Sequence, residues 1–174
     1  MTYQELIEGW KASKAEWRDY EAKCTAFAAK ICSTLLETWR FPDEKKLKLI
    51  DPEASNDKEI QTTAFGPAGL VKLKEHGWAE FCLYLTLQEA PNVFPYKPMK
   101  ILSRVRITDS LVFFKASEDG PELRFLNGDT AKSKFGGDYP KIDSPQASAA
   151  ITEAYERLIR RHVQDSFKNW RDEG

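Results

Sequence analysis

The sequence is poor in the residues that build metal sites and nucleophilic sites. Its 174 residues include two histidines, His76 and His162, and three cysteines with no CxxC spacing. No GxSxG elbow, HExxH helix or Walker phosphate loop occurs. A zinc site would need distant side chains to converge, because no local spacing supports one. We therefore expect no metal and no cofactor, and the balance leans away from an enzyme.

Long hydrophobic runs and charge of one sign are also lacking. No apolar run approaches the roughly 20 residues that a membrane-spanning helix needs, so no membrane association is expected. The first residues have neither a basic segment nor an apolar one, which predicts no secretory signal. Lys plus Arg is 26 and Asp plus Glu is 27, giving a net charge of −1. This balance excludes a globally basic nucleic-acid binder and a polyacidic tail.

The cysteines favour a reducing compartment. Cys24, Cys32 and Cys82 are odd in number. On one helix, Cys24 and Cys32 would lie about 12 Å apart, beyond the reach of a disulfide. Free thiols that behave as small hydrophobic side chains are therefore expected, and with them a cytoplasmic location.

Residues 1–41 predict a long helix. Thr2 and Glu5 have the spacing of a capping box at its start, and Phe41-Pro42 interrupts the pattern at its end. Between these signals the apolar residues recur every three or four positions, as on one face of a helix. They are Tyr3, Leu6, Ile7, Trp10, Trp17, Tyr20, Cys24, Phe27, Ala28, Ile31 and Leu35.

The expected length of this helix makes its N-terminal part a candidate interaction surface. At 1.5 Å per residue the helix is about 55 Å long, whereas a compact chain of this size is about 40 Å across. The helix therefore overhangs its domain, bends, or is covered by the C-terminal helix or by a second copy of the chain. Seven-residue spacing through Tyr3, Trp10, Trp17, Cys24 and Ile31 favours packing against another helix. The predicted interaction residues are Tyr3, Leu6, Trp10 and Trp17.

Residues 46–126 predict an antiparallel meander of five or six strands. The apolar period changes to two, and short polar turns separate the segments. Phe81, Leu83 and Leu85 fall on one face of their strand, opposite Cys82 and Tyr84. On the polar face Lys100, Arg104 and Arg106, with Tyr84, form either an ordinary solvated surface or a surface for an anion or single-stranded nucleic acid.

The C-terminal part predicts a polar loop at 127–143 and an amphipathic helix at 144–172. Ser144-Pro145 has the pattern of a helix start, where free amides favour an anion. Cations gather on one face of this helix, where they either bind an anion or complement the helix dipole and nearby carboxylates. The anion-binding candidates are Lys132, Lys134, Ser144, Arg157, Arg160, Arg161, Lys168 and Arg171. His162 falls on the apolar side, and we expect a core position for it.

One short segment resembles a known family. Phe94-Pro95-Tyr96-Lys97-Pro98-Met99-Lys100-Ile101 is similar to the proline-rich stretch of ubiquitin-conjugating enzymes and their inactive relatives. In that family too, this stretch follows an N-terminal helix and an antiparallel strand. The active members place a catalytic cysteine downstream, and no cysteine follows Cys82 here. The resemblance therefore implies no conjugating activity for this chain.

These patterns predict a single α+β domain over residues 1–174, with both helices against the apolar face of the sheet or against each other. The leading hypothesis is a non-catalytic cytosolic interaction protein of the adaptor, inhibitor, immunity or chaperone type, which binds a protein partner or a second copy. The alternative is a small-molecule-binding or enzymatic domain, with a pocket between sheet and helices that contains His162 or Tyr84. A weaker alternative is nucleic-acid binding through the basic face of the C-terminal helix.

Overall fold

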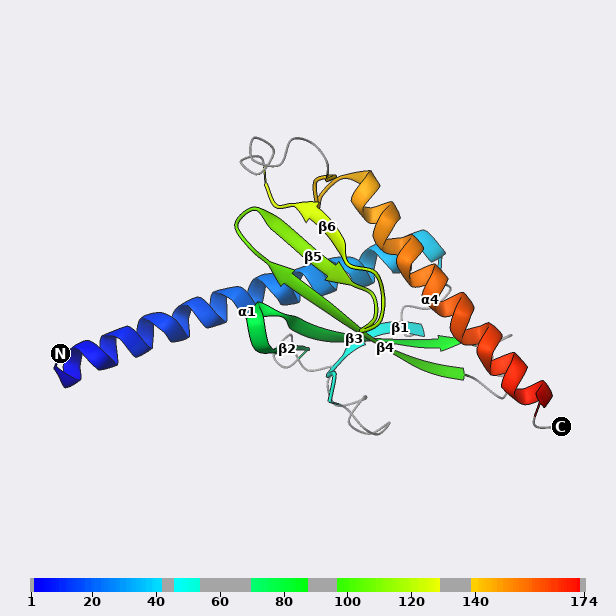
Figure 1. Ribbon diagram of the computed structural model, residues 1–174, viewed down its shortest axis with the longest axis horizontal. Coiled ribbons are helices and arrows are strands. Elements are labelled where there is room, and N and C mark those ends of the chain that lie inside the picture. Colours follow the sequence, from blue (N-terminus) through cyan, green and yellow to red (C-terminus); the bar gives the residue numbers. More distant parts are fainter. Residues whose placement is uncertain (1, 42–45, 54–69, 88–96, 129–138, 173–174) are drawn as a thin grey trace.

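The computed structural model describes residues 2–41, 46–53, 70–87, 97–128 and 139–172, without the side chains of Lys97 and of 166–172. A long helix comes first, a six-stranded sheet follows, and a second helix comes last (Figure 1). The elements are α1 (Tyr3–Trp39), β1 (Leu47–Ile50), β2 (Val71–Leu73), the 3-10 turn η2 (Glu75–Gly77), β3 (Ala79–Leu87), β4 (Lys97–Ile107), β5 (Leu111–Lys115), β6 (Leu123–Leu126) and α4 (Pro145–Asp172). The predicted α+β fold with an antiparallel sheet of five to six strands is confirmed.

The sheet is a meander in which β1 and β2 share one edge. Its order is β1-β3-β4-β5-β6, and β2 also pairs with β3. All of these pairings are antiparallel. Ile50, at the end of β1, lies opposite Cys82, and Val71, at the start of β2, lies opposite the neighbouring Phe81. The two short strands therefore form one line along β3, interrupted by the chain between them.

Both helices pack on one face of the sheet, as the sequence predicts. The period-two pattern sends Phe81, Leu83 and Leu85 of β3 into this layer and turns Cys82 and Tyr84 to the other face. The main core joins side chains of α1, of the sheet and of α4. Among its most buried members are Cys24, Ala28, Ile31, Leu35, Phe81, Val105, Phe114, Phe125, Ala147 and Tyr155.

Polar contacts fix the two helices to this layer. The hydroxyl of Tyr155 in α4 lies 2.7 Å from the hydroxyl of Ser103 in β4, which donates to the carbonyl of Ala116 at 3.1 Å. Trp39 Nε1, in the last turn of α1, donates to Glu156 Oε1 of α4 at 3.1 Å. Because buried polar groups are costly when they lack a partner, these bonds favour a single packing of α4.

The predicted helix ends are confirmed within two residues. The Thr2 hydroxyl accepts from the amide of Glu5, and the Glu5 carboxylate accepts from the amide of Thr2, as a capping box requires. At the other end Arg40 has φ 49°, a left-handed conformation that ends α1 at Trp39 instead of residue 41. At the start of α4 the Ser144 hydroxyl accepts from the amide of Ala147.

The first half of α1 extends beyond the rest of the molecule. Its first buried residue is Cys24, and the blue end of the helix projects away from the sheet in Figure 1. No bend interrupts the helix between Tyr3 and Trp39. The predicted overhang is therefore present. The alternative that α4 covers the aromatic stripe is wrong. The helix α4 packs near the C-terminal end of α1, where Trp39 bonds to Glu156, and Trp10 and Trp17 remain exposed (Figure 1).

Candidate functional site

The overhang carries most of the exposed hydrophobic surface of the described chain. Tyr3, Leu6, Trp10 and Trp17, which we call the docking stripe, are 77%, 55%, 59% and 63% exposed. Among the described residues one other large hydrophobic side chain is exposed, Val163 of α4. Large apolar patches on protein surfaces are common at interaction sites, so these four side chains are a candidate interaction surface. The structure thus brings together all four predicted interaction residues.

The docking stripe continues the face of α1 that packs on the sheet. Trp10 and Trp17 precede Cys24 and Ile31 at intervals of seven residues, and the latter two are buried in the core. Seven residues are close to two helical turns, so these side chains point in nearly the same direction. The stripe therefore faces the side on which the sheet lies, and it becomes exposed only because the sheet ends before the helix does.

A groove of about 710 Å³ lies where the overhang leaves the body of the molecule. We call it the exit groove. It is lined by Glu16, Trp17, Tyr20, Leu73, Lys74, Glu75, His76, Gly77 and Trp78. The groove is continuous with the docking stripe, since Trp17 belongs to both. It was not predicted from the sequence, because its two walls are about 60 residues apart in the chain.

Tyr20 and the η2 turn shape this groove. His76 and Gly77 both have positive φ, 58° and 75°, so the chain reverses tightly between β2 and β3. The Tyr20 hydroxyl donates to the carbonyl of Gly77 and accepts from the amide of Ile107 at 3.1 Å. Burial raises the pKa of Tyr20 to about 12. The hydroxyl therefore remains protonated at neutral pH and holds α1 against the turn.

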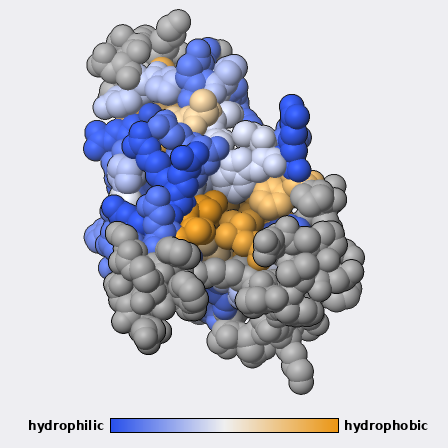
Figure 2. Space-filling view, turned by 90° about the vertical axis from the view of Figure 1, so that its right-hand side faces the viewer, coloured by the Kyte–Doolittle hydropathy of each residue, from blue (hydrophilic) through white to orange (hydrophobic). Residues whose placement is uncertain are grey.

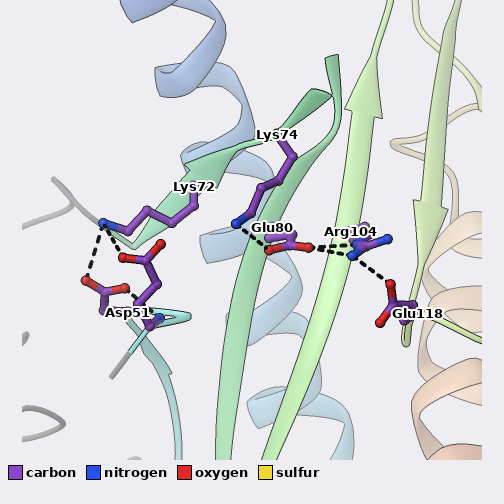
Figure 3. A network of polar contacts seen from close by, with 7 residues as sticks. Asp51, Lys72, Lys74, Glu80, Arg104 and Glu118 are labelled. Carbon is purple, nitrogen blue, oxygen red and sulfur yellow. Dashed lines mark hydrogen bonds and ion pairs between the residues drawn. The ribbon is translucent and has the colours of Figure 1, made fainter. Parts of the chain in front are cut away.

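The outer face of the sheet carries cations that are already paired. Figure 3 shows Glu80 of β3 between Lys74 and Arg104, with Glu118 beyond Arg104. Glu80 is only 6% exposed and accepts from Arg104 Nε at 2.8 Å, while Lys74 Nζ lies 3.3 Å from its second oxygen. The carboxylates of Glu80 and Glu118 therefore already bind the ammonium and guanidinium groups that would otherwise bind an anion. This arrangement favours the ordinary solvated surface over the anion site for Arg104.

Arg106 is engaged with aromatic rings instead. Its guanidinium carbon lies 4.3 Å from the centroid of Phe113 and 5.2 Å from that of Trp78. Arg124, across the sheet, lies 5.6 Å from the same Phe113 ring. These stacked contacts are cation–π interactions that order the outer face. Of the sequence-predicted group, Tyr84 is buried beside Ile50, Cys82 and Leu102, away from this stack.

The basic face of α4 is exposed, but part of it is neutralised. Arg157 pairs with Glu153 at 2.5 Å, and Arg160 and Arg161 are exposed. Arg157 and Arg161 line a cleft of about 360 Å³ between α4 and the turn that joins β5 to β6. The side chains of Lys168 and Arg171 lie outside the described residues. The pairing between Arg157 and Glu153 is the one expected if these cations mainly stabilise the helix.

Of the remaining anion-binding candidates, the structure describes Ser144. The Ser144 hydroxyl is engaged by its own helix, since it accepts from Ala147 and donates to the carbonyl of Lys141 at 2.6 Å. Lys132 and Lys134 lie outside the described residues. Within the part of the chain that the structure describes, no group of three or more His, Cys, Asp or Glu side chains lies close enough to hold a metal ion.

The groups proposed for a catalytic pocket are separated. His162 is exposed on α4, so its expected core position is wrong, and Tyr84 lies on the opposite face of the sheet from the helices. His162 lines a cleft of about 280 Å³ between α4 and β4, so the predicted pocket with His162 is present in part, but Tyr84 does not line it. Between α1 and α4 the structure leaves a cavity of about 20 Å³, which holds about one water molecule. Burial raises the pKa of Cys24, Cys32 and Cys82 to about 11, so these free thiols are poor nucleophiles at neutral pH.

The end of the molecule opposite the overhang shows a different surface. In Figure 2, hydrophilic residues cover most of the described surface of that end, and hydrophobic colour gathers in one patch near its middle. No described helix is both long enough and apolar enough to cross a membrane. The docking stripe and the exit groove are therefore the features that stand out on the described part of the chain.

Comparison with protein-family models, with curated proteins and with solved structures finds no match for this chain. The resemblance to ubiquitin-conjugating enzymes is thus not supported by a family match, and Phe94, Pro95 and Tyr96 lie outside the described residues. Function must be argued from the surface itself.

Proposed function

We propose that this protein is a non-catalytic interaction domain whose docking element is the overhanging half of α1. One observation carries the proposal: four of the five exposed large hydrophobic side chains of the described chain lie on one face of the first 17 residues. Placing such side chains in water is unfavourable by about 25 cal/mol for each Å² of apolar surface. Covering the stripe with a partner removes this cost. Adaptor, inhibitor, immunity and chaperone roles all fit such an element, and a cytoplasmic setting remains part of the proposal.

The shape of the surface favours an amphipathic helix as the partner. The docking stripe is straight, about 21 Å long, and repeats every seven residues, which is the spacing of helix-on-helix packing. The exit groove at its inner end offers Trp17 and Trp78 as walls for an apolar residue at one end of the partner helix. Aromatic side chains of this kind dominate binding energies at protein interfaces.

The chemistry of the described residues supports an enzyme less well. The thiols are buried or half-buried, and two carboxylates on the outer face of the sheet, Glu80 and Glu118, are engaged in ion pairs with Arg104. The cavity between α1 and α4 holds about one water molecule, and Glu118, which lines the cleft beside His162, is held in an ion pair with Arg104.

A face-specific crosslinking experiment tests the proposed function. A photoreactive phenylalanine analogue replaces Trp10 in one variant and Glu8, on the opposite face of α1, in a matched control. Both variants are irradiated in cells that produce the protein. We expect protein adducts from position 10 that are absent from position 8 and are lost when Trp17→Ser is added. Equal labelling at both positions, or none at position 10, overturns the proposal.

A further inference from the structure

The docking stripe has the geometry to pair with itself. We propose that two copies of this chain form an antiparallel dimer through the first halves of their α1 helices, each inserting its Tyr3 and Leu6 into the exit groove of the other. This inference rests on the proposed function and names the partner as a second copy of the chain.

The direction of the stripe decides the orientation of the two copies. Trp17 lies on the face of α1 that, about two turns further on, is covered by the sheet, and the groove wall formed by Leu73–Trp78 stands between these points. A parallel partner helix laid on the stripe would continue into this wall, and its own sheet would overlap the first. An antiparallel partner ends at the wall, and its sheet lies beyond Tyr3. The overhang therefore accepts a second copy in the antiparallel direction.

The residues of the stripe match one another in one antiparallel register. When Trp10 lies opposite Ser13 of the second copy, the same two-fold axis places Leu6 opposite Trp17 and Tyr3 opposite Tyr20. The large indole of Trp10 then meets a small side chain, as knobs-into-holes packing requires. At about 100° per residue, each of these pairs is centred on the direction in which Cys24, Ala28, Ile31 and Leu35 point into the core. The paired residues therefore face each other without any rotation of α1 about its own axis.

The area available is that of a small specific interface. A large aromatic side chain contributes about 200 Å². At the exposures given above, the four stripe residues together leave on the order of 500 Å² uncovered per chain. Two copies would bury about 1,000 Å² from these residues alone, and the walls of both grooves add to it. Specific interfaces begin near this size.

Charge distinguishes this dimer from a complex with an acidic partner. Lys11, Lys14 and Arg18 flank one side of the stripe. A two-fold axis across the helices brings the same flank of both copies together. In the register above, Lys14 lies about 7.5 Å along the axis from the other Lys14, whereas the two Arg18 residues are about 20 Å apart, so the repulsion comes mainly from Lys14. Salt screens this repulsion. We therefore expect the dimer to become stronger as salt is added, whereas an acidic partner would bind more weakly.

Sedimentation velocity over a concentration series tests the self-association. We expect a monomer–dimer equilibrium that Trp10→Ser with Trp17→Ser weakens at least 30-fold, since a central tryptophan contributes strongly to an interface. Glu8→Ser with Ala15→Ser, on the opposite face, is the matched control and leaves the equilibrium unchanged. Both pairs of positions are on the overhang, so circular dichroism should show the same fold in each. A monomer at every concentration, or a dimer insensitive to the tryptophan changes, overturns the inference.

Disulfide trapping tests the orientation. A Leu6→Cys chain and a Trp17→Cys chain are treated with a mild oxidant, each alone and as an equimolar mixture. We expect a mixed disulfide and no self-linked product, because Leu6 meets Trp17 of the other copy and lies about 16 Å along the axis from the other Leu6. Self-linking of the Leu6→Cys chain, or no mixed disulfide from a dimeric sample, overturns the inference. If the chain is monomeric but position 10 still crosslinks to another protein in cells, the second copy is wrong and the proposed function stands.

Discussion

Tyr20 is the residue at which the exposed and buried halves of α1 meet. Its hydroxyl donates to the carbonyl of Gly77 and accepts from the amide of Ile107, so one side chain joins α1, the η2 turn and β4. Desolvation by burial raises its pKa from the ordinary 10 to about 12. The ionised form is disfavoured in the folded protein because it lacks water and can no longer donate to Gly77. The attachment of the overhang is therefore sensitive to alkaline pH.

We predict that Tyr20 contributes stability that is lost at high pH. Its folded pKa lies above the unfolded value, so its contribution is complete below pH 10 and falls as the pH rises toward about 12. Tyr20→Phe should lower the free energy of unfolding by about 1 kcal/mol at pH 7 and reduce the alkaline loss. Urea unfolding at a series of pH values measures both effects.

The three thiols define the background of this experiment. Burial raises the pKa values of the thiols to about 11, so the unfolded chain ionises first and stability already falls from about pH 9. Burial also raises the pKa of Tyr155, so this tyrosine adds to the loss above pH 10 in both chains. The difference between Tyr20→Phe and the unchanged chain isolates the tyrosine. Tyr3→Phe, at an exposed position, is the control and should behave as the unchanged chain. An alkaline loss that Tyr20→Phe leaves intact would contradict the role of this hydroxyl.

At the scale of the element, the overhang is a helix with little support. Residues 3–19 make no contribution to the buried core, and isolated helices of this length are marginal in water. The capping box at Thr2 and Glu5 and an ion pair between Asp19 and Lys23 at 2.8 Å stabilise it locally. Its helicity therefore depends on local propensity and on what covers the stripe.

We predict that Gly9→Ala strengthens the overhang without changing the global stability. A Cβ at position 9 meets no atom within 4 Å, and alanine favours a helix interior over glycine by about 1 kcal/mol. Amide exchange of residues 3–19, measured by mass spectrometry in a dilute sample, should slow by about fivefold. The urea midpoint should stay the same. Faster exchange would contradict the gain in helix stability. A changed urea midpoint would contradict the separation of the overhang from the core.

The elements were predictable from local signals, and the depth to which they are buried was not. Thr2 with Glu5 and Ser144 with Pro145 mark helix starts correctly, because capping is a property of a few adjacent residues. His162 was placed in the core because it lies on the apolar side of α4, but α4 is exposed from Arg160 to Asp165. Periodicity shows which face of a helix is apolar. It does not show where the neighbouring element ends.

In the candidate site too, features of one helix could be predicted from the sequence, and contacts between distant segments could not. The docking stripe could be predicted, since it depends on one helix and on its length relative to the domain. The exit groove and the Arg106 stack could not, because Trp17 and Trp78 come to line one groove, and Arg106 meets Phe113, only after the sheet has formed. The shared edge of β1 and β2 was likewise hidden, since Ile50 and Val71 are 21 positions apart in the sequence.

The whole molecule consists of a folded body and a projecting rod. Every buried side chain of α1 lies at or beyond Cys24, so the body contains all of the described core. The ion pair between Lys30 and Asp143, together with the Trp39–Glu156 hydrogen bond, ties the second half of α1 to the segment before α4 and to α4 itself. The body should therefore fold without the rod.

We predict that deletion of residues 1–18 leaves a stable monomer. Tyr20 and the buried half of α1 remain, so the free energy of unfolding in urea should change by less than about 1 kcal/mol. The radius of gyration from small-angle X-ray scattering should fall, because about 24 Å of helix is removed. Self-association should be lost with the docking stripe. A truncated chain that fails to fold would show that the rod stabilises the body.

The interrupted edge of the sheet is a place where insertions and deletions in the sequence can be tolerated. Ile50 and Val71 pair with adjacent residues of β3, so the chain departs from the sheet and rejoins it at one point. Sequence added or removed between these two positions leaves every rung of the ladder in register. This point therefore suits the insertion of a reporter or the natural gain of a new segment, at the edge farthest in strand order from β6.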